Sequence, residues 1–289
     1  MRAMARELCI LHANCQGDPL AWLLERHPGF AQRFELRRYV NYLREPVPSS
    51  ELASAAVLIH QQLGPKWNEL ASANMRAQLP ESATAICLPN LMCRTCWPFW
   101  ESRPGMDFSD SFLNALQDRG LSKAEILHIA CRTDLSRYHD VQALAESSLV
   151  IEREKEKDWD IKLTDHIEAN YTRRRLFTTI NHPCPELNAT IARGVLDLLE
   201  LESPSPELEA AMPAIEPELE LPFHPQVASI LGLDWVEPGN SFRIYEHRLT
   251  YEEYVSHYLD CRSLGESALI AFIRLRHGAM TERGGDAAS

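Results

Sequence analysis

Short apolar runs alternate with segments of helical spacing in the N-terminal part of the chain. Runs of this kind are typical of strands that are buried on both faces of a sheet. We expect such strands at Leu8–Leu11, Ala56–His60 and Thr84–Leu88, and Phe34–Val40 is a further strand candidate. Helical spacing predicts helices at Pro19–His27 and at Trp67–Leu79, the second ending before Pro80. Strands that alternate with helices indicate a largely parallel sheet.

Helical spacing dominates the middle of the chain. Ser122 and Glu125 have the spacing of a capping box, which predicts the start of a helix there. Leu176–Ile180 is a further strand candidate, and Pro185 can begin a helix that ends near Leu201. Other helices are expected at Asp107–Arg119, Tyr138–Glu156 and Ile161–Arg175.

The C-terminal part has a different composition. Ser203–Pro222 is rich in Pro and Glu, which predicts an exposed linker or insertion. Beyond it, capping-box spacing at Thr250–Glu253 and Ser263–Glu266 predicts helices, and Gly278 is expected to end the last one. We therefore predict an α/β fold, with a mostly parallel sheet and flanking helices in the N-terminal two thirds and an additional, largely helical C-terminal part. The expected divisions are an α/β core with the active-site cleft at 1–202, the linker at 203–222, a helical part packing on the core at 223–280 and a disordered tail at 281–289.

Composition narrows the class of protein. Of the 289 residues 45% are hydrophobic, which allows a sizeable core, and no stretch approaches the roughly 20 apolar residues that span a bilayer. The net charge of −12 disfavours nucleic acid and anionic membrane surfaces as partners. No apolar signal region opens the chain, and the eight cysteines show no disulfide framework. We expect a cytoplasmic protein with mostly reduced thiols, no membrane insertion and no nucleic-acid partner.

The most reactive residues follow the first predicted strand, in the run His12-Ala13-Asn14-Cys15-Gln16-Gly17-Asp18-Pro19. Asp18 is expected to cap the next helix, with Pro19 at its first position. A helix N-terminus beside Cys15 supplies N–H groups and partial positive charge, a setting that favours a thiolate and suits an oxyanion or a phosphate. Cys15 is therefore a candidate nucleophile, with Asn14 and Gln16 as oxyanion donors. The alternative is a small residue buried at a strand end, but polar neighbours bunched there are unfavourable unless they are used.

A second strand end carries Asn181-His182-Pro183, just before the helix that Pro185 begins. Because the carboxyl ends of parallel strands meet at one edge of a sheet, His182 can reach Cys15 or a substrate hydroxyl and act as a general base. The alternative is a structural histidine in a turn. His60 ends another predicted strand and Gln61 follows it, and both would line the same edge unless they belong to an ordinary loop.

Two other segments carry candidate binding residues. Asn90 and Arg94 follow the fourth predicted strand, in a loop that we expect to face a ligand. Cys93 and Cys96 have the spacing of half a zinc or redox site, but no second pair completes it, so no metal site is predicted. The basic cluster Arg173–Arg175 can bind phosphate or can stabilise the C-terminal end of a helix. The chain contains no Walker A loop, dinucleotide fingerprint, zinc-protease helix or Gly-x-Ser-x-Gly elbow.

The order of these segments resembles the WcbI-like family, whose members are acetyltransferases of bacterial capsular polysaccharide biosynthesis. The resemblance covers roughly residues 6–200 by ordered motif matching. It rests on Asn14-Cys15-Gln16 at the first strand end, and then on Ile59-His60-Gln61, Leu88-Pro89-Asn90-Leu91 with Trp97-Pro98, and the segment from Leu176 to Pro183.

The resemblance implies an acetyl-CoA-dependent O-acetyltransferase acting on a sugar hydroxyl of a capsule precursor. Its ligands would be coenzyme A or acetyl-CoA and a sugar or polysaccharide precursor, with other capsule biosynthesis proteins as candidate partners. Cys15 and His182 would be catalytic, and Asn14 and Gln16 would stabilise the oxyanion. Two alternatives stay open: a Cys/His esterase or deacetylase of acylated sugars, and a non-catalytic subunit that binds CoA or sugar in a capsule assembly complex. The residues expected to bind the cofactor are His12, Gln61, Lys66, Asn90, Arg94, Arg173 and Arg174.

Overall fold

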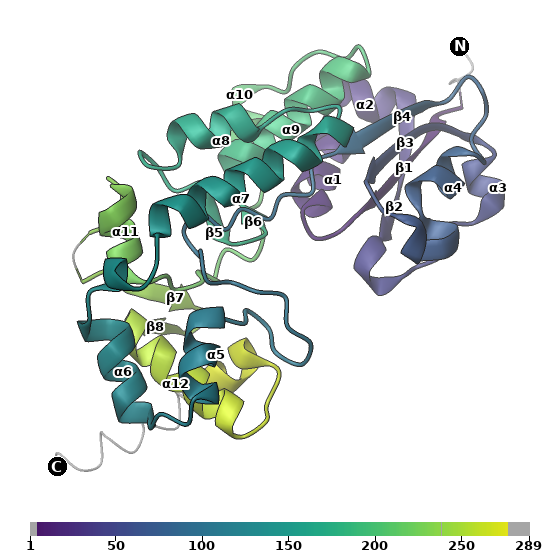
Figure 1. The fold of residues 1–289 in the computed structure, drawn as a ribbon. Coiled ribbons are helices and arrows are strands. Elements are labelled where there is room, and N and C mark those ends of the chain that lie inside the picture. Colours follow the sequence, from purple (N-terminus) through teal and green to yellow (C-terminus); the bar gives the residue numbers. More distant parts are fainter. Residues whose placement is uncertain (1–4, 238, 277–289) are drawn as a thin grey trace, which may run out of the picture. The chain divides into compact units, whose positions relative to one another are not determined.

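The computed structural model describes residues 5–237 and 239–276. Its main sheet has four parallel strands in the order β2-β1-β3-β4 (Figure 1). These strands are β1 (Glu7–Ala13), β2 (Phe34–Val40), β3 (Ala55–Gln61) and β4 (Thr84–Leu88). All four strands agree with the predicted ones, with small differences at the ends of β1 and β3. The parallel sheet with flanking helices confirms the predicted α/β class.

Helices follow the strands as the alternation predicts. In chain order they are α1 (Gly17–Arg26), α2 (Pro28–Arg33), α3 (Ser49–Leu52), α4 (Ser72–Arg76), α5 (Ser111–Asp118), α6 (Lys123–Arg132), α7 (Val141–Lys155), α8 (Thr164–Asn170), α9 (Pro185–Leu198), α10 (Pro206–Ala210), α11 (Pro225–Leu231) and α12 (Tyr251–Ser263). Short strands occur at β5 (Phe177–Thr179), β6 (His182–Pro183), β7 (Phe242–Ile244) and β8 (His247–Leu249). Residues 269–276 are also helical. Among the described residues, no helix has both the length and the apolar character needed to cross a membrane.

Different elements cover the two faces of the main sheet. Ile10 of β1 packs with Leu52 of α3 and Met75 of α4 in a buried cluster on one face. Residues at odd separation along a strand point to opposite faces, so Ala13 lies on the other face. There α1 approaches closely, because a Cβ atom on Gly17 would lie only 2.8 Å from the Cβ atom of Ala13. α9 packs against α1 and β4. Glycine at position 17 therefore lets α1 begin directly against β1.

Two helices begin at other residues than expected. Asp18 lies in the first turn of α1 and does not cap it, because Gln16 occupies the N-cap position. α5 begins after Asp110, whose side chain accepts a hydrogen bond from the N–H of Leu113 at 2.9 Å. This cap fixes the start of α5, so the helix does not extend back to Asp107 as predicted.

Capping boxes show where local sequence is sufficient to place a helix. Those at Ser122 and Thr250 are both formed, and they open α6 and α12 as predicted. The expected box at Ser263 instead coincides with the end of α12. Gly265 has a left-handed φ of 72° there, and the N–H of Glu266 bonds back to the carbonyl of Cys261, an arrangement that ends a helix.

The C-terminal part departs from two expectations. The segment 203–222, expected to be an exposed linker or insertion, contains α10 and several buried apolar side chains: Met212, Ile215, Leu219 and Leu221. Burial of these side chains makes the segment part of the packed structure. β7 and β8 form an antiparallel hairpin, which the largely helical prediction missed. The helix end expected at Gly278 and the tail expected at 281–289 lie outside the described residues.

The chain forms two compact units that interleave along the sequence. The main sheet lies in the first unit, whereas α5, α6, α11, α12 and the β7–β8 hairpin lie in the second. The chain crosses between the units several times, so the division expected near residue 202 does not separate them. The first unit consists of Met1–Met92, Ile151–Ala169 and Asn181–Ile215, and the second of Cys93–Val150, Asn170–Ile180 and Glu216–Ser289.

Candidate functional site

Polar segments meet at the carboxyl end of the main sheet, within the first unit. Asn14 and Gln16 follow β1, Gln61 ends β3, and Asn90 follows β4. Because parallel strands end at the same edge, residues that are distant in sequence come together there. The structure thus brings these predicted residues together around Cys15.

Gln61 is the fully buried centre of a hydrogen-bond network at this edge. Its Oε1 atom accepts from the N–H of Asn14 at 2.9 Å and from Nδ2 of Asn41 at 3.1 Å. Its Nε2 atom donates to the carbonyl of Pro89 at 3.1 Å and to Oε1 of Gln16 at 3.3 Å. Both polar atoms of the side chain are engaged, so Gln61 holds the loops after β1, β2 and β4. This differs from the predicted direct contact with a cofactor.

Gln16 links the Cys15 turn to a distant segment. It is only 5% exposed, and its Nε2 atom donates to the carbonyls of Leu91 and Asn181, both at 2.8 Å. Its Oε1 atom also accepts from the N–H of Leu91 at 3.1 Å. Both N–H bonds of the amide are therefore used, which differs from the predicted role of Gln16 as an oxyanion donor. Gln16 instead positions the turn relative to His182, the residue after Asn181.

The turn at Cys15 is closed by its own backbone hydrogen bonds. The carbonyl of Asn14 accepts from the N–H of Gly17 at 2.9 Å, and that of Cys15 accepts from Asp18 at 3.1 Å. Cys15 itself is half-buried, two positions before the first residue of α1. A thiol placed there feels the partial positive charge of the helix N-terminus and can be reached by a ligand.

Asn14 keeps donor capacity that Gln16 does not have. Its Oδ1 atom accepts from the N–H of Gln16 at 2.9 Å, which orients the amide. Its Nδ2 atom lies 3.5 Å from Oδ1 of Asn90, at the upper limit of a hydrogen bond. Such a long contact is readily exchanged for a stronger acceptor, so Asn14 is the side chain of this turn best able to donate to an oxyanion.

His182 is held nearly out of contact with solvent. Its side chain is 5% exposed, and burial lowers its pKa to about 4. The Nδ1 atom is buried and has no hydrogen-bond partner in the described part of the chain. Nδ2 of Asn188 in α9 donates to the carbonyl of the next residue, Pro183, at 3.1 Å and fixes the turn. The ring is therefore neutral near pH 7, which is the state that a general base requires.

His12 and His60 lie opposite each other on the adjacent strands β1 and β3. Both are fully buried, and burial, together with the charge of His60, lowers the pKa of His12 to about 4. Burial also lowers the pKa of His60, whose Nδ1 atom lies 3.2 Å from Oγ of Ser72. Both ring nitrogens of His12 lack a partner among the described residues. His12 is fully covered from solvent in this structure, and its role in cofactor binding stays a prediction.

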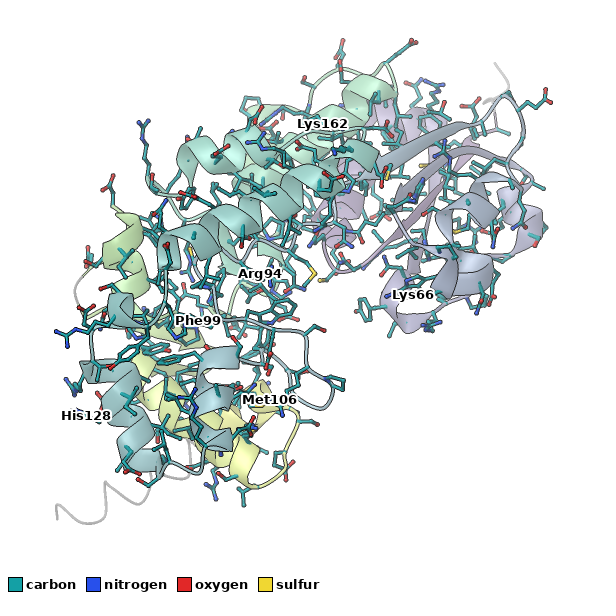
Figure 2. All side chains as sticks on the ribbon, viewed as in Figure 1. Lys66, Arg94, Phe99, Met106, His128 and Lys162 are labelled. Atoms are coloured by element: carbon teal, nitrogen blue, oxygen red, sulfur yellow. The ribbon has the colours of Figure 1, made fainter. Side chains whose placement is uncertain are left out.

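The predicted cationic residues belong to different units. Lys66 is exposed on η2 (Pro65–Leu70), after β3 in the first unit (Figure 2). Arg94, Arg173 and Arg174 belong to the second unit. The N–H of Arg94 donates to Oγ of Ser148 at 2.8 Å, whereas the Arg174 guanidinium donates to Oδ1 of Asn170 at 2.7 Å. Lys66 is thus the predicted cation that shares a unit with Cys15.

Cys93 and Cys96 are both buried in the second unit. Burial raises the pKa of the Cys96 thiol to about 12, and Sγ of Cys93 lies 3.2 Å from Oγ1 of Thr95. Over residues 5–237 and 239–276, no group of three or more His, Cys, Asp or Glu residues is placed to hold a metal ion.

The loops after β2 and β3 add residues that the sequence analysis missed. The Arg44 guanidinium lies over the ring of Trp67, 4.6 Å from its centroid, and Tyr42 is 59% exposed. Asn68, with φ of 53°, kinks η2 from within and interrupts the helix expected over Trp67–Leu79, so that α4 begins only at Ser72. The available signal was positional: Asn41 to Arg44 follow a predicted strand of the same sheet, as Asn14 and Gln61 do.

A family model described as "Polysaccharide biosynthesis enzyme WcbI" matches residues 8–204. The chain belongs to the WcbI family. All the site residues of the first unit described above lie within the matched range, from the Cys15 turn to His182. This confirms the family predicted from the ordered motifs, and it identifies the chain as a member of a family of polysaccharide biosynthesis enzymes.

A solved WcbI structure has the same fold. It aligns with a TM-score of 0.74 over 93% of this chain and 94% of the other, at 18% sequence identity. That structure is described as WcbI, a polysaccharide biosynthesis enzyme, in its native form without a disulfide bond between coenzyme A and a cysteine. No curated protein sequence matches this WcbI-family chain.

Proposed function

We propose that this chain transfers an acetyl group from acetyl-CoA to a hydroxyl of a polysaccharide or of its sugar precursor. The observation that carries the proposal is the hydrogen bond from Gln16 to the carbonyl of Asn181, which ties the Cys15 turn to the residue before His182. A thiol and an imidazole on two linked segments are the nucleophile and base that acyl transfer needs. The family's role in polysaccharide biosynthesis supports the acceptor, and the description of the similar structure, which mentions CoA and a cysteine, supports the donor.

In the first step, His182 takes the proton of the Cys15 thiol, and the sulfur attacks the carbonyl carbon of the thioester. Asn14 donates through Nδ2 to the oxygen that becomes negative. When the bond between this carbon and the CoA sulfur breaks, the CoA thiolate takes the proton from His182 and leaves. Acetyl-Cys15 and a neutral His182 remain.

In the second step, His182 takes the proton of the acceptor hydroxyl, and the oxygen attacks acetyl-Cys15. The ester bond forms, the bond to Cys15 breaks, and the Cys15 thiolate recovers the proton from His182. Burial keeps the pKa of His182 near 4 in the resting protein. A thiolate or oxyanion formed beside the ring raises this pKa, so the imidazole becomes a stronger base as negative charge develops.

The phosphates of CoA require cations near the site. The first unit offers Lys66 on η2 and Arg44 after β2, on loops that follow strands of the main sheet. Stacking on Trp67 holds the Arg44 guanidinium in place while leaving its N–H edges able to donate to phosphate. We assign these two residues to CoA binding, with Asn90 beside Asn14 at the acyl end.

Thermal unfolding with and without ligands tests the donor. CoA and acetyl-CoA should raise the melting temperature, whereas ATP and NAD should not. A ligand that binds the folded protein at about 100 times its Kd adds about 2.7 kcal/mol to the free energy of unfolding. The absence of a shift with millimolar CoA would overturn the proposal and favour a Cys15–His182 esterase or deacetylase of acylated sugars. If the protein binds CoA but transfers no acyl group to any sugar, and if Cys15→Ala binds CoA equally well, the protein is a non-catalytic binding subunit.

A further inference from the structure

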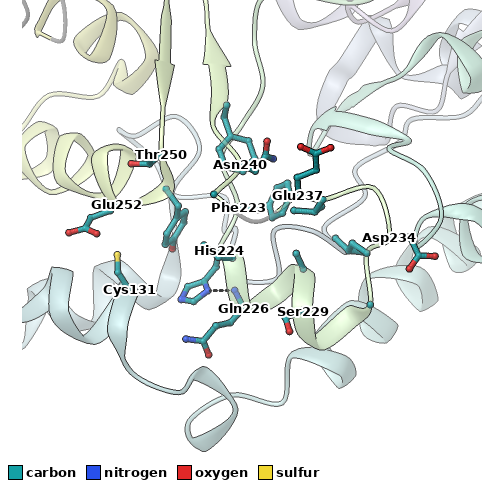
Figure 3. A pocket seen from close by; sticks show the side chains of 18 of the residues that line it. Cys131, Phe223, His224, Gln226, Ser229, Asp234, Glu237, Asn240, Thr250 and Glu252 are labelled. Carbon is teal, nitrogen blue, oxygen red and sulfur yellow. Dashed lines mark hydrogen bonds between the residues drawn. The ribbon is translucent and has the colours of Figure 1, made fainter.

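The second unit contains a cavity that the proposed reaction does not use. Its volume of about 560 Å³ lies within the range of roughly 300–1,000 Å³ that is typical of small-molecule sites. Its walls come from the end of α6, from α11 and the segment after it, from β7 and from the start of α12 (Figure 3). Apart from the α6 residues, this lining lies beyond residue 204, where the match to the family model ends.

Aromatic rings provide an apolar surface in this cavity. Phe223 and Phe242 are buried and pack edge to face, with ring centroids 4.9 Å apart. Tyr251 is 6% exposed, and its hydroxyl makes no hydrogen bond within the described part of the chain. These three rings therefore form an apolar part of the cavity wall.

Two polar side chains of the lining form hydrogen bonds within the protein. The His224 ring lies 2.5 Å from the carbonyl of Ala130 and accepts from the N–H of Gln226 at 3.1 Å, the bond drawn in Figure 3. The Gln226 side chain accepts from the N–H of Leu135 and donates to the carbonyl of Thr133. These bonds join α11 to α6 and the residues after it, so neither side chain is available to a ligand.

The remaining polar lining is negative and hydrogen-bonding. Asp234 and Glu237 line the cavity, and neither carboxylate forms an ion pair with any described residue. Arg132 also lines the cavity, but its guanidinium is paired with Glu252 at 2.8 Å. Asn240 adds an amide to the lining (Figure 3). Unpaired carboxylates repel phosphate groups, so this lining disfavours CoA and nucleotides.

A sugar ring matches this combination of groups. Its C–H face packs against the apolar part of the wall, and its hydroxyls donate to carboxylates, which form stronger hydrogen bonds than neutral acceptors do. We propose that the cavity binds a neutral saccharide unit of the polysaccharide, or of the precursor, on which the family acts. This binding site rests on the cavity and on the family, and it stands independently of the acyl transfer proposed at Cys15.

Direct binding of neutral oligosaccharides tests the proposal. We would titrate the full chain with a panel built from glucose, galactose, mannose and N-acetylglucosamine, using saturation-transfer NMR and calorimetry. Glu237→Gln should weaken binding about tenfold, since it removes a charged acceptor. Ser229→Trp should abolish binding by filling the cavity. Glu146→Gln, which changes an exposed carboxylate on α7 outside the cavity, is the matched control and should bind as the unchanged chain does.

The outcomes separate this site from the acyl-transfer site. Saccharide binding that is lost in Ser229→Trp, while the thermal shift with CoA is retained, supports the proposal. No binding of any panel member at millimolar concentration overturns it. Binding that is equal in all three variants overturns it as well, as does CoA binding that disappears in Ser229→Trp. Melting curves of the variants show whether each one is folded.

Discussion

The Nε2 atom of Gln16 lies 2.8 Å from the carbonyl oxygen of Asn181 and donates a hydrogen bond to it. The two residues are 165 positions apart in the chain, and each adjoins a residue of the proposed chemistry, Cys15 and His182. Gln16 is 5% exposed, so water competes little for this bond. A single buried amide therefore joins two segments that are distant in the sequence.

Gln16→Glu should disrupt the site. A carboxylate cannot donate to the carbonyls of Leu91 and Asn181, and it would place negative charge against both oxygens. We expect a loss of about 1–3 kcal/mol in the free energy of unfolding and a large loss of acyl transfer. Urea unfolding and a transfer assay measure the two effects. The exposed Gln62→Glu is the control, and full activity in Gln16→Glu would contradict the positioning role.

Incubation with acetyl-CoA in the absence of acceptor should leave an acetyl group on Cys15. Intact-mass and peptide mass spectrometry should find one added acetyl group that hydroxylamine removes, because the linkage is a thioester. Cys15→Ser should abolish this labile adduct, whereas Cys261→Ser should keep it. Cys261 is buried with its thiol pKa raised to about 11, and it belongs to the second unit. Transfer to a sugar without any such adduct would exclude the two-step route.

The pH dependence of kcat/KM should report the lowered pKa of His182. In the free protein this pKa is about 4 instead of 6.5, because burial disfavours the charged ring. The acid limb of the profile should therefore inflect near pH 4–5 and not near 6.5. His182→Ala should remove most of the activity, while the exposed His128→Ala should leave the profile unchanged. An inflection near 6.5 would show that His182 is not the titrating base.

His12→Leu should stabilise the fold, most of all in acid. The pKa of His12 is about 4 when folded and 6.5 when unfolded, so between these values the unfolded chain binds more protons. Stability from this neutral ring is complete above pH 6.5 and is lost as the pH falls toward 4. Leucine cannot be protonated, so it removes this loss in acid. It also removes two buried nitrogens without partners, which should raise the free energy of unfolding by about 1–3 kcal/mol. Urea unfolding at pH 8 and pH 5 measures the change in the free energy of unfolding, with His128→Leu as the control. A destabilised variant would contradict this account.

Arg44→Ala and Lys66→Ala should weaken CoA binding through its phosphates. Calorimetry should show a loss of several-fold for CoA and a smaller salt dependence, because each cation contributes a screened attraction. Pantetheine, which lacks the nucleotide and its phosphates, should bind all variants equally. Arg37→Ala on β2, an exposed arginine paired with Glu35, is the control. Equal losses for CoA and pantetheine would mean that these residues support the loops and do not bind phosphate.

Local patterns in the sequence were sufficient for the main sheet and for several helix starts. Phe34–Val40 and Thr84–Leu88 are strands with the predicted ends, since the pattern that predicts a strand is a property of neighbouring residues. The capping boxes at Ser122 and Thr250 formed for the same reason, because their hydrogen bonds span only three positions. The residues 203–222 were mispredicted because their Pro and Glu content concealed apolar side chains that become buried only through distant contacts.

The sequence by itself determined the α/β class, the family motifs and the placement of Asn14, Cys15 and Gln61 at strand ends. Only the tertiary structure decided which hydrogen-bond partners the side-chain amides of Asn14, Gln16 and Gln61 have. An amide can donate to an oxyanion or to a carbonyl with similar chemistry, and the choice depends on which partners the packed chain brings within about 3 Å. Gln16 and Gln61 found partners far away in the sequence, in pairings whose free energy comes from the whole fold and not from adjacent residues.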